Sequence, residues 1–269
     1  MGKICFIAGH GKISGGGYDP GAVYGKYEEF KIVKEIAKYA QTYYNKTYKE
    51  QADLMNYKGD LGLNDRINKL QDNTYDFIAE IHLNAGGGNG VECYYKNKNA
   101  LGQKYADAIC DQISADLKIP QRPNWTDEDG GDKVKLDTDG GDYFGIIRRT
   151  KPTAVLVECC FIDTTSNLNA VKTASGQKKC GEAIAKAVAK VRGAKKKNEF
   201  EPYQVKVTYK KVNIRKTPKF TKKDIVGTIT DKGVYTIVAE KKVNGIPMGK
   251  LKSGEGWISL RSKYVKKLK

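Results

Sequence analysis

The chain has 269 residues, of which 39% are hydrophobic, and its formal net charge is +17. This length is sufficient for a sizeable buried core, which excludes a small scaffold held together by disulfide bonds. The mean hydropathy is -0.59. No apolar run approaches the roughly 20 residues that a bilayer span requires, so an integral membrane protein is also excluded.

The N-terminal residues, MGKICFIAGHG, contain one lysine and an apolar run that ends before Gly9. This run is too short for the apolar region of a signal peptide, and no small-residue cleavage site follows it. We therefore expect synthesis in the cytoplasm without a secretion signal of the protein's own.

In the first 193 residues, short apolar runs alternate with longer amphipathic segments. The runs typical of buried strands cover residues 4–8, 77–82, 91–95 and 154–158. Helical spacing of apolar residues covers residues 29–44, 63–71, 100–117 and 176–191. This alternation predicts an α/β fold with a mostly parallel sheet flanked by helices.

The segment of residues 121–143 is polar, rich in glycine and acidic. Its acidic residues lack the alternate spacing and the terminal glutamate of an EF-hand calcium loop. We expect a solvated acidic loop in this segment.

The composition changes after Gly193. A charged stretch at residues 194–202 ends with Pro202, and short β-rich runs separated by Gly, Pro, Asn and Asp follow it. Strands at this spacing without a helical segment predict a small all-β barrel or sandwich. The sequence thus predicts a domain at residues 1–193, a charged linker at 194–202 and a second domain at 203–269.

The positive charge belongs almost wholly to the C-terminal part. Residues 202–269 carry 18 Lys and Arg against four Asp and Glu, a net charge of +14, whereas residues 1–193 carry +2. Such a field attracts a polyanion, whether nucleic acid, anionic lipid or an acidic wall polymer. The lysines are scattered through every strand, and no signature of an RNA-recognition or oligonucleotide-binding fold is present, which argues against nucleic acid.

The six cysteines all lie in otherwise apolar stretches and form no CxxC pair. We expect them to be buried thiols that pack as small hydrophobic side chains. A nucleophilic Cys159 or Cys160 with a nearby histidine as base is the alternative.

The only two histidines, His10 and His82, each come at or just after the end of a predicted strand. Because ligands of open α/β sheets bind outside the carboxyl ends of the strands, both side chains could face one crevice. A catalytic zinc ion commonly takes three protein ligands, and two histidines with a glutamate form one recurring set. The sequence therefore indicates a metal site that requires a third, acidic ligand.

Two glutamates at the start of a predicted helix are candidates for this third ligand. Glu29 shares a helix face with Ile32 and Val33 and so points toward the sheet, whereas Glu28 lies on the same face as Lys31. This geometry favours Glu29. A solvated acid in the first helical turn is the alternative for either glutamate.

Glu158 closes the apolar strand AVLVE. A buried carboxylate is costly unless it has a partner, and such sites are where raised pKa values arise, so Glu158 is a candidate general base. An ion pair with Arg148 or Arg149 is the structural alternative.

Several of these motifs, in this order, resemble the zinc N-acetylmuramoyl-L-alanine amidases of bacterial wall remodelling and phage lysis. The matching segments are AGHG, DPGA, a glutamate that opens a helix, IHLNA, VECYY and RRTKPTAVLVECCFID, which together extend over nearly all of residues 1–190. The resemblance implies that the zinc ligands are His10, Glu29 and His82. It also implies that Glu158 is catalytic and that Asn84 and Arg148 bind substrate. The chain departs from the family in having Thr153 before Ala154, with Pro152 displaced by one position, and Cys-Cys where a small or apolar residue and glycine are common.

The C-terminal segment resembles bacterial SH3-like modules over about residues 203–268, through VNIRKTP, IVGTI, KGVYTIVAE and GEGWISLRSKYV. Such modules bind the wall in enzymes of this type. The two resemblances imply a phage-type lytic enzyme that hydrolyses the amide bond between N-acetylmuramic acid and L-alanine. Its expected partners are peptidoglycan and anionic wall polymers, which it would reach from the bacterial cytoplasm through a holin pore. A non-catalytic wall or polyanion binder and a cysteine-type wall peptidase are the alternatives.

Overall fold

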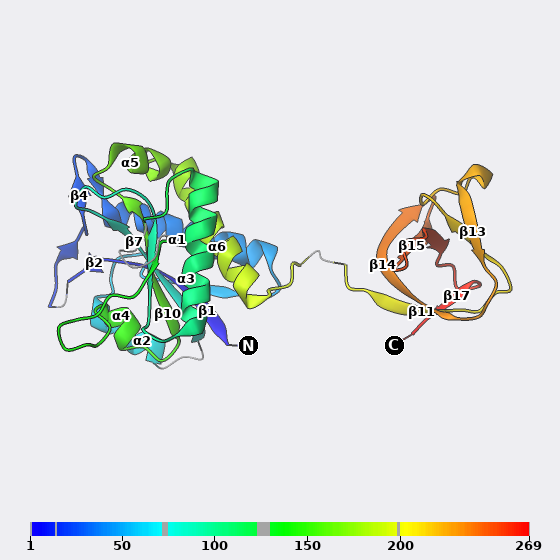
Figure 1. Ribbon diagram of the computed structural model, residues 1–269, viewed down its shortest axis with the longest axis horizontal. Coiled ribbons are helices and arrows are strands. Elements are labelled where there is room, and N and C mark those ends of the chain that lie inside the picture. The colour runs from blue at the N-terminus through cyan, green and yellow to red at the C-terminus, as the bar shows by residue number, and fades with distance from the viewer. Residues whose placement is uncertain (1, 14, 72–74, 123–129, 198–199, 269) are drawn as a thin grey trace. The chain divides into compact units, whose positions relative to one another are not determined.

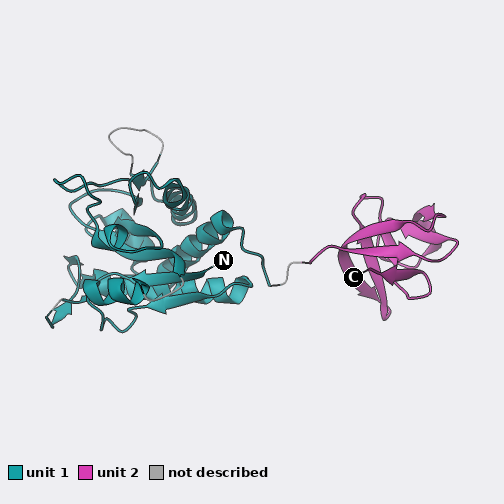
Figure 2. Cartoon of the chain, turned by 90° about the horizontal axis from the view of Figure 1, so that it is seen from below, with its two compact units in different colours: residues 1–197 teal, residues 198–269 magenta. Residues whose placement is uncertain are grey.

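The computed structural model describes residues 2–13, 15–71, 75–122, 130–197 and 200–268. The chain divides into two compact units, residues 1–197 and 198–269 (Figure 2). Each unit has a hydrophobic core of its own. Within the described ranges, no helix has both the length and the apolar character that crossing a membrane requires.

A six-stranded sheet forms the centre of the first unit. Its strands follow the order β6 (Ala52–Met55), β1 (Lys3–Ala8), β7 (Tyr75–Asn84), β10 (Thr153–Phe161), β8 (Glu92–Tyr95) and β9 (Asp132–Lys133). The four strands from β6 to β10 are parallel to one another, and β8 runs antiparallel to β10. The predicted mostly parallel sheet is therefore confirmed.

Helices cover both faces of this sheet (Figure 1). Helices α1 (Glu29–Thr47), α3 (Ala100–Leu117) and α6 (Ala174–Arg192) belong to the larger core, together with Phe6 of β1. Helices α2 (Leu63–Gln71) and α4 (Gly145–Arg148) belong to a smaller core on the opposite face, together with Cys5 and Ile7. Because side chains of a strand alternate between its two faces, one short apolar run supplies both cores.

The parallel arrangement brings three strand ends to one edge of the sheet. Strands β1, β7 and β10 are neighbours in the same direction, and Glu158 of β10 is the register partner of His82 of β7. Two short hairpins lie between β1 and α1 in the chain. They are β2 (Gly11–Lys12) with β3 (Tyr18–Asp19), and β4 (Val23–Tyr24) with β5 (Tyr27–Glu28).

Part of the acidic segment 121–143 lies outside the described residues, namely residues 123–129. Its described remainder contributes β9 at the sheet edge and a turn in which the Asp137 amide donates to the Gly141 carbonyl. The sequence prediction did not include the edge strand β6 or the seven-residue helix α5 (Thr165–Val171), nor the two-residue strands β2 to β5 and β9 and the short helix α4.

The second unit is an antiparallel sheet of seven strands, with a single 3-10 turn, η1 (Lys222–Asp224), among its described residues. The strand order is β13 (Ile225–Ile229), β12 (Val212–Arg215), β16 (Trp257–Ser259), β15 (Ile246–Leu251), β14 (Val234–Val243), β11 (Tyr203–Val207) and β17 (Val265–Lys267). Alternating apolar side chains such as Val205, Val207 and Ile237 fill its core. The predicted all-β character of the C-terminal part is confirmed.

Candidate metal centre

His10 follows the end of β1 in the left-handed backbone conformation, with φ of 60°. Its carbonyl oxygen accepts hydrogen bonds from Asn56 Nδ2 at 2.7 Å and from Arg66 Nη1 at 3.1 Å. Its ring atom Nδ1 lies 2.8 Å from Asp19 Oδ2. These contacts fix the imidazole so that Nε2 faces Glu29.

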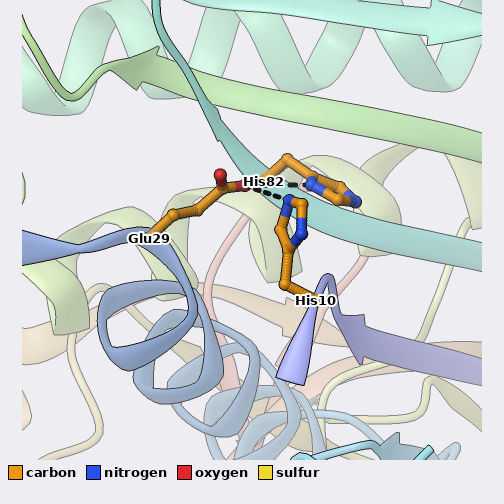
Figure 3. Close-up of side chains that lie close together, drawn as sticks. All are labelled: His10, Glu29 and His82. Atoms are coloured by element: carbon orange, nitrogen blue, oxygen red, sulfur yellow. Dashed lines mark hydrogen bonds and ion pairs between the residues drawn. The ribbon is translucent and has the colours of Figure 1, made fainter. Parts of the chain in front are cut away.

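Glu29 is the first residue of α1 and is buried, with 2% of its surface exposed. Its Oε2 accepts from the amide of Ala22 at 2.8 Å and its Oε1 from the amide of Leu83 at 2.9 Å. The same Oε1 lies 3.2 Å from His10 Nε2 and 3.0 Å from His82 Nδ1 (Figure 3). Burial alone would raise the pKa of Glu29, but the hydrogen bonds with His10 and His82 outweigh it and hold the pKa well below its ordinary value.

His82 lies near the end of β7, and its ring centroid is 4.8 Å from that of His10. Its Nδ1 faces Glu29, and its Nε2 lies 3.5 Å from Glu80 Oε2. Burial lowers the pKa of His82, but the two carboxylates outweigh burial and raise it well above its usual value. Gly9 packs directly on this ring, since a Cβ there would lie 2.2 Å from His82 Cε1.

The ligand atoms of His10, Glu29 and His82 lie within 4.8 Å of one another. Two imidazole nitrogens and one carboxylate oxygen form a donor set that suits Zn²⁺ better than Mg²⁺ or Ca²⁺, which prefer oxygen ligands. Asp19 holds the second ring nitrogen of His10, as carboxylates commonly do for histidine ligands. Glu28 instead pairs with Lys31 at 2.7 Å, away from this cluster.

Glu158 lies beside His82 on the neighbouring strand and is largely buried. Its Oε2 is inaccessible to solvent and has no hydrogen-bond partner among the described residues. Burial raises the pKa of Glu158 to about 7. The carboxyl group can therefore hold or release a proton near neutral pH.

The ion pair considered for Glu158 is absent from the described residues. Arg148 Nη1 lies 3.6 Å from Asp137 Oδ2, and Arg149 Nη1 donates to Asn64 Oδ1 at 2.8 Å. That structural alternative was wrong because both guanidinium groups contact other acceptors.

A cavity of about 370 Å³ opens beside the cluster. His10, His82 and Glu158 line its polar side, and its apolar wall comes from both α2 and α4 and from β10, through Leu63, Phe144, Ile146 and Leu156. A pocket with an apolar wall and a few convergent polar groups is typical of a small-molecule site.

The two predicted substrate-binding residues do not line this cavity. Asn84 Nδ2 donates to Glu92, and its Oδ1 accepts from the amide of Ala85 at 2.8 Å. Arg148 is half-exposed and pairs with Asp137.

Three polar residues at the site were not among the predicted ones, namely Asp19, Arg66 and Glu80. Glu80 precedes His82 by two residues in a predicted strand, so the period of two already placed both side chains on one face. Arg66 Nε lies 2.8 Å from Glu80 Oε1. Burial raises the pKa of Glu80, but the positive charge of Arg66 outweighs it and the pKa is lowered. Arg66 comes from the distant helix α2, and only the fold brings it to the site.

All six cysteines are free and buried, which confirms the predicted burial of the thiols. Burial raises the pKa of Cys160 well above its ordinary value, and no cysteine lines the described cavity beside the cluster. A thiol at this depth is a poor nucleophile because little thiolate is present at neutral pH.

Two curated relatives match most of the chain. A sporulation-specific N-acetylmuramoyl-L-alanine amidase of Bacillus subtilis is 28% identical, and the alignment covers 77% of this chain and 74% of the relative. An endolysin of Bacillus phage SPP1 is also 28% identical, and the alignment covers 98% of each chain.

Solved structures share the fold of the first unit. Cwp6 from Clostridium difficile is 28% identical with a TM-score of 0.61, and the match covers 71% of this chain but 29% of that one. The catalytic domain of the CD27L endolysin shares the fold, with 24% identity and a TM-score of 0.54. The match covers 71% of this chain and 98% of that chain.

The sequence profile described as N-acetylmuramoyl-L-alanine amidase matches residues 4–190. This range includes α1, β7 and β10, which carry Glu29, His82 and Glu158, and it includes His10, which follows the end of β1. Because the match extends over more than half of the chain, the chain belongs to the N-acetylmuramoyl-L-alanine amidase family.

Proposed function

We propose that the protein is a zinc-dependent peptidoglycan hydrolase that cleaves the amide bond between N-acetylmuramic acid and L-alanine of the stem peptide. The observation that carries this proposal is the convergence of His10, Glu29 and His82 beside the unpartnered carboxylate of Glu158, in a chain of the amidase family. The names of its amidase relatives support this choice of bond.

The three ligands would be His10 Nε2, His82 Nδ1 and Glu29 Oε1, the atoms that already face one another. A bound zinc ion supplies a Lewis acid that polarises a carbonyl group and lowers the pKa of a coordinated water. Asp19 holds the His10 ring in position for this role, and the Glu80 carboxylate lies 3.5 Å from His82 Nε2.

Glu158 acts as the general base in this proposal. Its carboxylate takes a proton from the attacking water and delivers it to the amine of the leaving L-alanine. Burial raises the pKa of this group in the metal-free site, and a carboxyl group with a raised pKa can both accept a proton and pass it on. The apolar wall of the cavity limits access of other water to the reacting groups.

Asn84 and Arg148 are the proposed substrate contacts. Arg148 is half-exposed, and a substrate carboxylate would take the place of Asp137, which lies 3.6 Å from its guanidinium group. Asn84 lies at the end of β7, two residues after His82.

We further propose that residues 203–269 form an SH3-like wall-binding domain, joined through the charged linker 194–202 to the catalytic domain at 1–193. Seven antiparallel strands and a net charge of +14 support this role, since bacterial walls carry acidic polymers. The match to a phage endolysin over 98% of the chain supports a lytic role. We expect the enzyme to reach the wall from the host cytoplasm through a holin pore.

The test is mass spectrometry of purified walls digested by the protein, with and without a zinc chelator. The proposal requires stem peptides with a free L-alanine amine, glycan strands with intact N-acetylmuramic acid, and loss of both products in chelator. Restoration by added zinc, and not by magnesium, should follow. Cleavage within the peptide that chelator leaves unchanged would instead favour the cysteine-type peptidase, and intact walls would favour a binding protein.

A further inference from the structure

The second unit contains a cavity of about 430 Å³ that takes no part in the proposed chemistry. Four segments surround this cavity: β12, the segment before η1, the β14–β15 turn, and β16 with the residues that follow it. Three of its lining residues are cationic, namely Lys211, Arg215 and Arg261, and none is acidic.

Two described cavities of this unit differ in the charge of their lining. A larger cavity of the same unit, of about 640 Å³, is lined by Asp231 and Glu255 and by no Lys or Arg. Of these two cavities, the smaller one therefore has the charge that suits an anion. Within the described part of the chain, Lys211, Arg215 and Arg261 form no ion pair, although the carboxylate of Asp224 lies close enough to interact electrostatically with Arg215.

Arg215 is held in place before any ligand arrives. Its Nη1 donates to the carbonyl oxygen of Thr221 at 2.9 Å, and its guanidinium carbon lies 5.2 Å from the ring centroid of Phe220. A planar guanidinium that is already oriented loses little conformational entropy when it binds a carboxylate or a phosphate.

Ser259 supplies an unsatisfied hydrogen-bonding group in the lining. The residue is 8% exposed, and its Oγ is buried without a hydrogen-bond partner. A buried hydroxyl without a partner is costly. A ligand oxygen in the cavity would satisfy this group, so Ser259 points independently to a ligand.

Aromatic side chains line the cavity beside the cations. The rings of Tyr209 and Tyr264 lie 5.3 Å apart at 81°, and Tyr209 and Phe220 are 49% and 38% exposed. Such exposed ring faces would pack against the uncharged part of a ligand. The lining therefore suits an anionic group carried by a larger organic molecule.

We propose that this cavity binds one oxyanion group of the bacterial wall, a carboxylate or a phosphate, between Arg215, Arg261 and the Ser259 hydroxyl. The proposal rests on the wall-binding role proposed for residues 203–269. It adds that binding depends on a particular pocket and not on the net charge of the unit alone.

The test compares two double variants that change the net charge equally. Lys211→Gln with Arg261→Gln removes two cations from the cavity, and Lys232→Gln with Lys250→Gln removes two exposed cations elsewhere in the unit. Both pairs are placed in full-length protein that carries Glu158→Gln, which should keep the walls intact during cosedimentation with purified walls.

Loss of the Arg261 contact, together with the Lys211 charge, should weaken wall binding by about tenfold or more in the cavity pair, because hydrogen bonds between charged groups are among the strongest. The control pair should lose about threefold or less, the range of one exposed ion pair. Ser259→Ala should also weaken binding with no change in charge. Equal weakening of wall binding by both pairs would show that binding does not depend on this cavity.

Treated walls identify the source of the oxyanion. One sample has its phosphate polymers removed with hydrofluoric acid, and another has its carboxylates amidated. If the two pairs bind one of these samples equally well, the group removed from that sample is the ligand. A third sample receives both treatments. If the cavity pair still binds that sample more weakly than the control pair does, the ligand is not an oxyanion. Weakening of duplex DNA binding alone would replace the wall ligand with nucleic acid.

Failure of the proposed function gives a different result. If the protein with an unaltered cavity does not bind walls at all, the wall-binding role itself fails. With Glu158 restored, the cavity pair should cleave soluble muropeptide at the normal rate, so the inference can fail while the amidase activity stands.

Discussion

Glu28 and Glu29 are neighbours in the sequence, yet their carboxylates have different surroundings. Glu28 is the residue before α1 and pairs with exposed Lys31. Glu29 begins the helix and reaches over the strand ends to both histidines. One residue of difference thus separates a surface ion pair from a candidate ligand, and the helical face of Glu29 allowed this to be predicted from the sequence.

This pair of neighbours provides a matched test of the metal centre. Glu29→Gln should lose most of the bound zinc, because two remaining ligands hold the ion too weakly. Glu28→Gln should retain one zinc per chain, as measured by elemental analysis after dialysis. His82→Ala should behave as Glu29→Gln does. Equal zinc content in the two glutamine variants would show that the ligand set is misassigned.

A second prediction separates the metal from the base. Glu158→Gln keeps the size and polarity of the side chain but removes the proton acceptor, so activity on soluble muropeptide should fall about 10²-fold or more. Its zinc content should stay that of the unaltered protein, because Glu158 is not one of the clustered ligands. Full activity in this variant would assign the base role to another group.

The thiols provide a third test. Cys159→Ala and Cys160→Ala each remove a buried sulfur that lies outside the cavity lining. Each should keep the rate of muropeptide cleavage within about threefold, while the small cavity left behind lowers stability by about 1 kcal/mol. Inactivation of a variant that still binds zinc and unfolds cooperatively would revive the cysteine-type mechanism.

At the scale of elements, two segments that follow neighbouring strands are tied together. Asp163, just beyond β10, accepts hydrogen bonds through Oδ2 from the amides of Gly86 at 2.7 Å and Gly87 at 2.9 Å. Burial raises the pKa of Asp163, but these two bonds outweigh it and lower the pKa. The loop after His82 is thereby attached to the strand that carries Glu158.

Asp163→Ala should loosen this loop and leave the cluster intact. We expect amide hydrogen exchange at Gly86 and Gly87 to become about tenfold faster, since two hydrogen bonds to a charged acceptor are lost. Zinc content should not change. Asp137→Ala, which removes a carboxylate that makes no described contact with this loop, is the control and should leave exchange at both glycines as it is. Unchanged exchange in Asp163→Ala would show that other contacts hold the loop.

The central elements could be predicted because their sequences have one dominant pattern. Strand β10 contains the run AVLVE, which is buried on both faces, and α1 repeats its apolar residues at helical spacing. Strand β6 and helix α5 were missed because they are short and carry few fully buried side chains. For the site, strand ends and helix faces indicated the cluster. The contacts of Asp19 and Arg66 depend on tertiary structure, which no local pattern contains.

At the scale of the whole molecule, the proposal assigns catalysis to the first compact unit and wall binding to the second. A truncation to residues 1–197 should retain zinc and cleave soluble muropeptide at the full rate. On intact walls it should be slower, because the +14 segment no longer concentrates the enzyme there. Turbidity loss of walls beside muropeptide cleavage measures both rates. Equal wall activity of the truncated and full-length proteins would remove the targeting role from the second unit.

His10 has the left-handed backbone conformation that most residues other than glycine avoid. At most positions glycine is less stabilising than alanine, but at φ of 60° the order should reverse, by about 1 kcal/mol, because a Cβ is strained there. In metal-free protein, His10→Gly should therefore unfold at a higher denaturant concentration than His10→Ala, although both lose the imidazole. If so, glycine would give the more stable fold at position 10. The histidine is then kept because the reaction requires it.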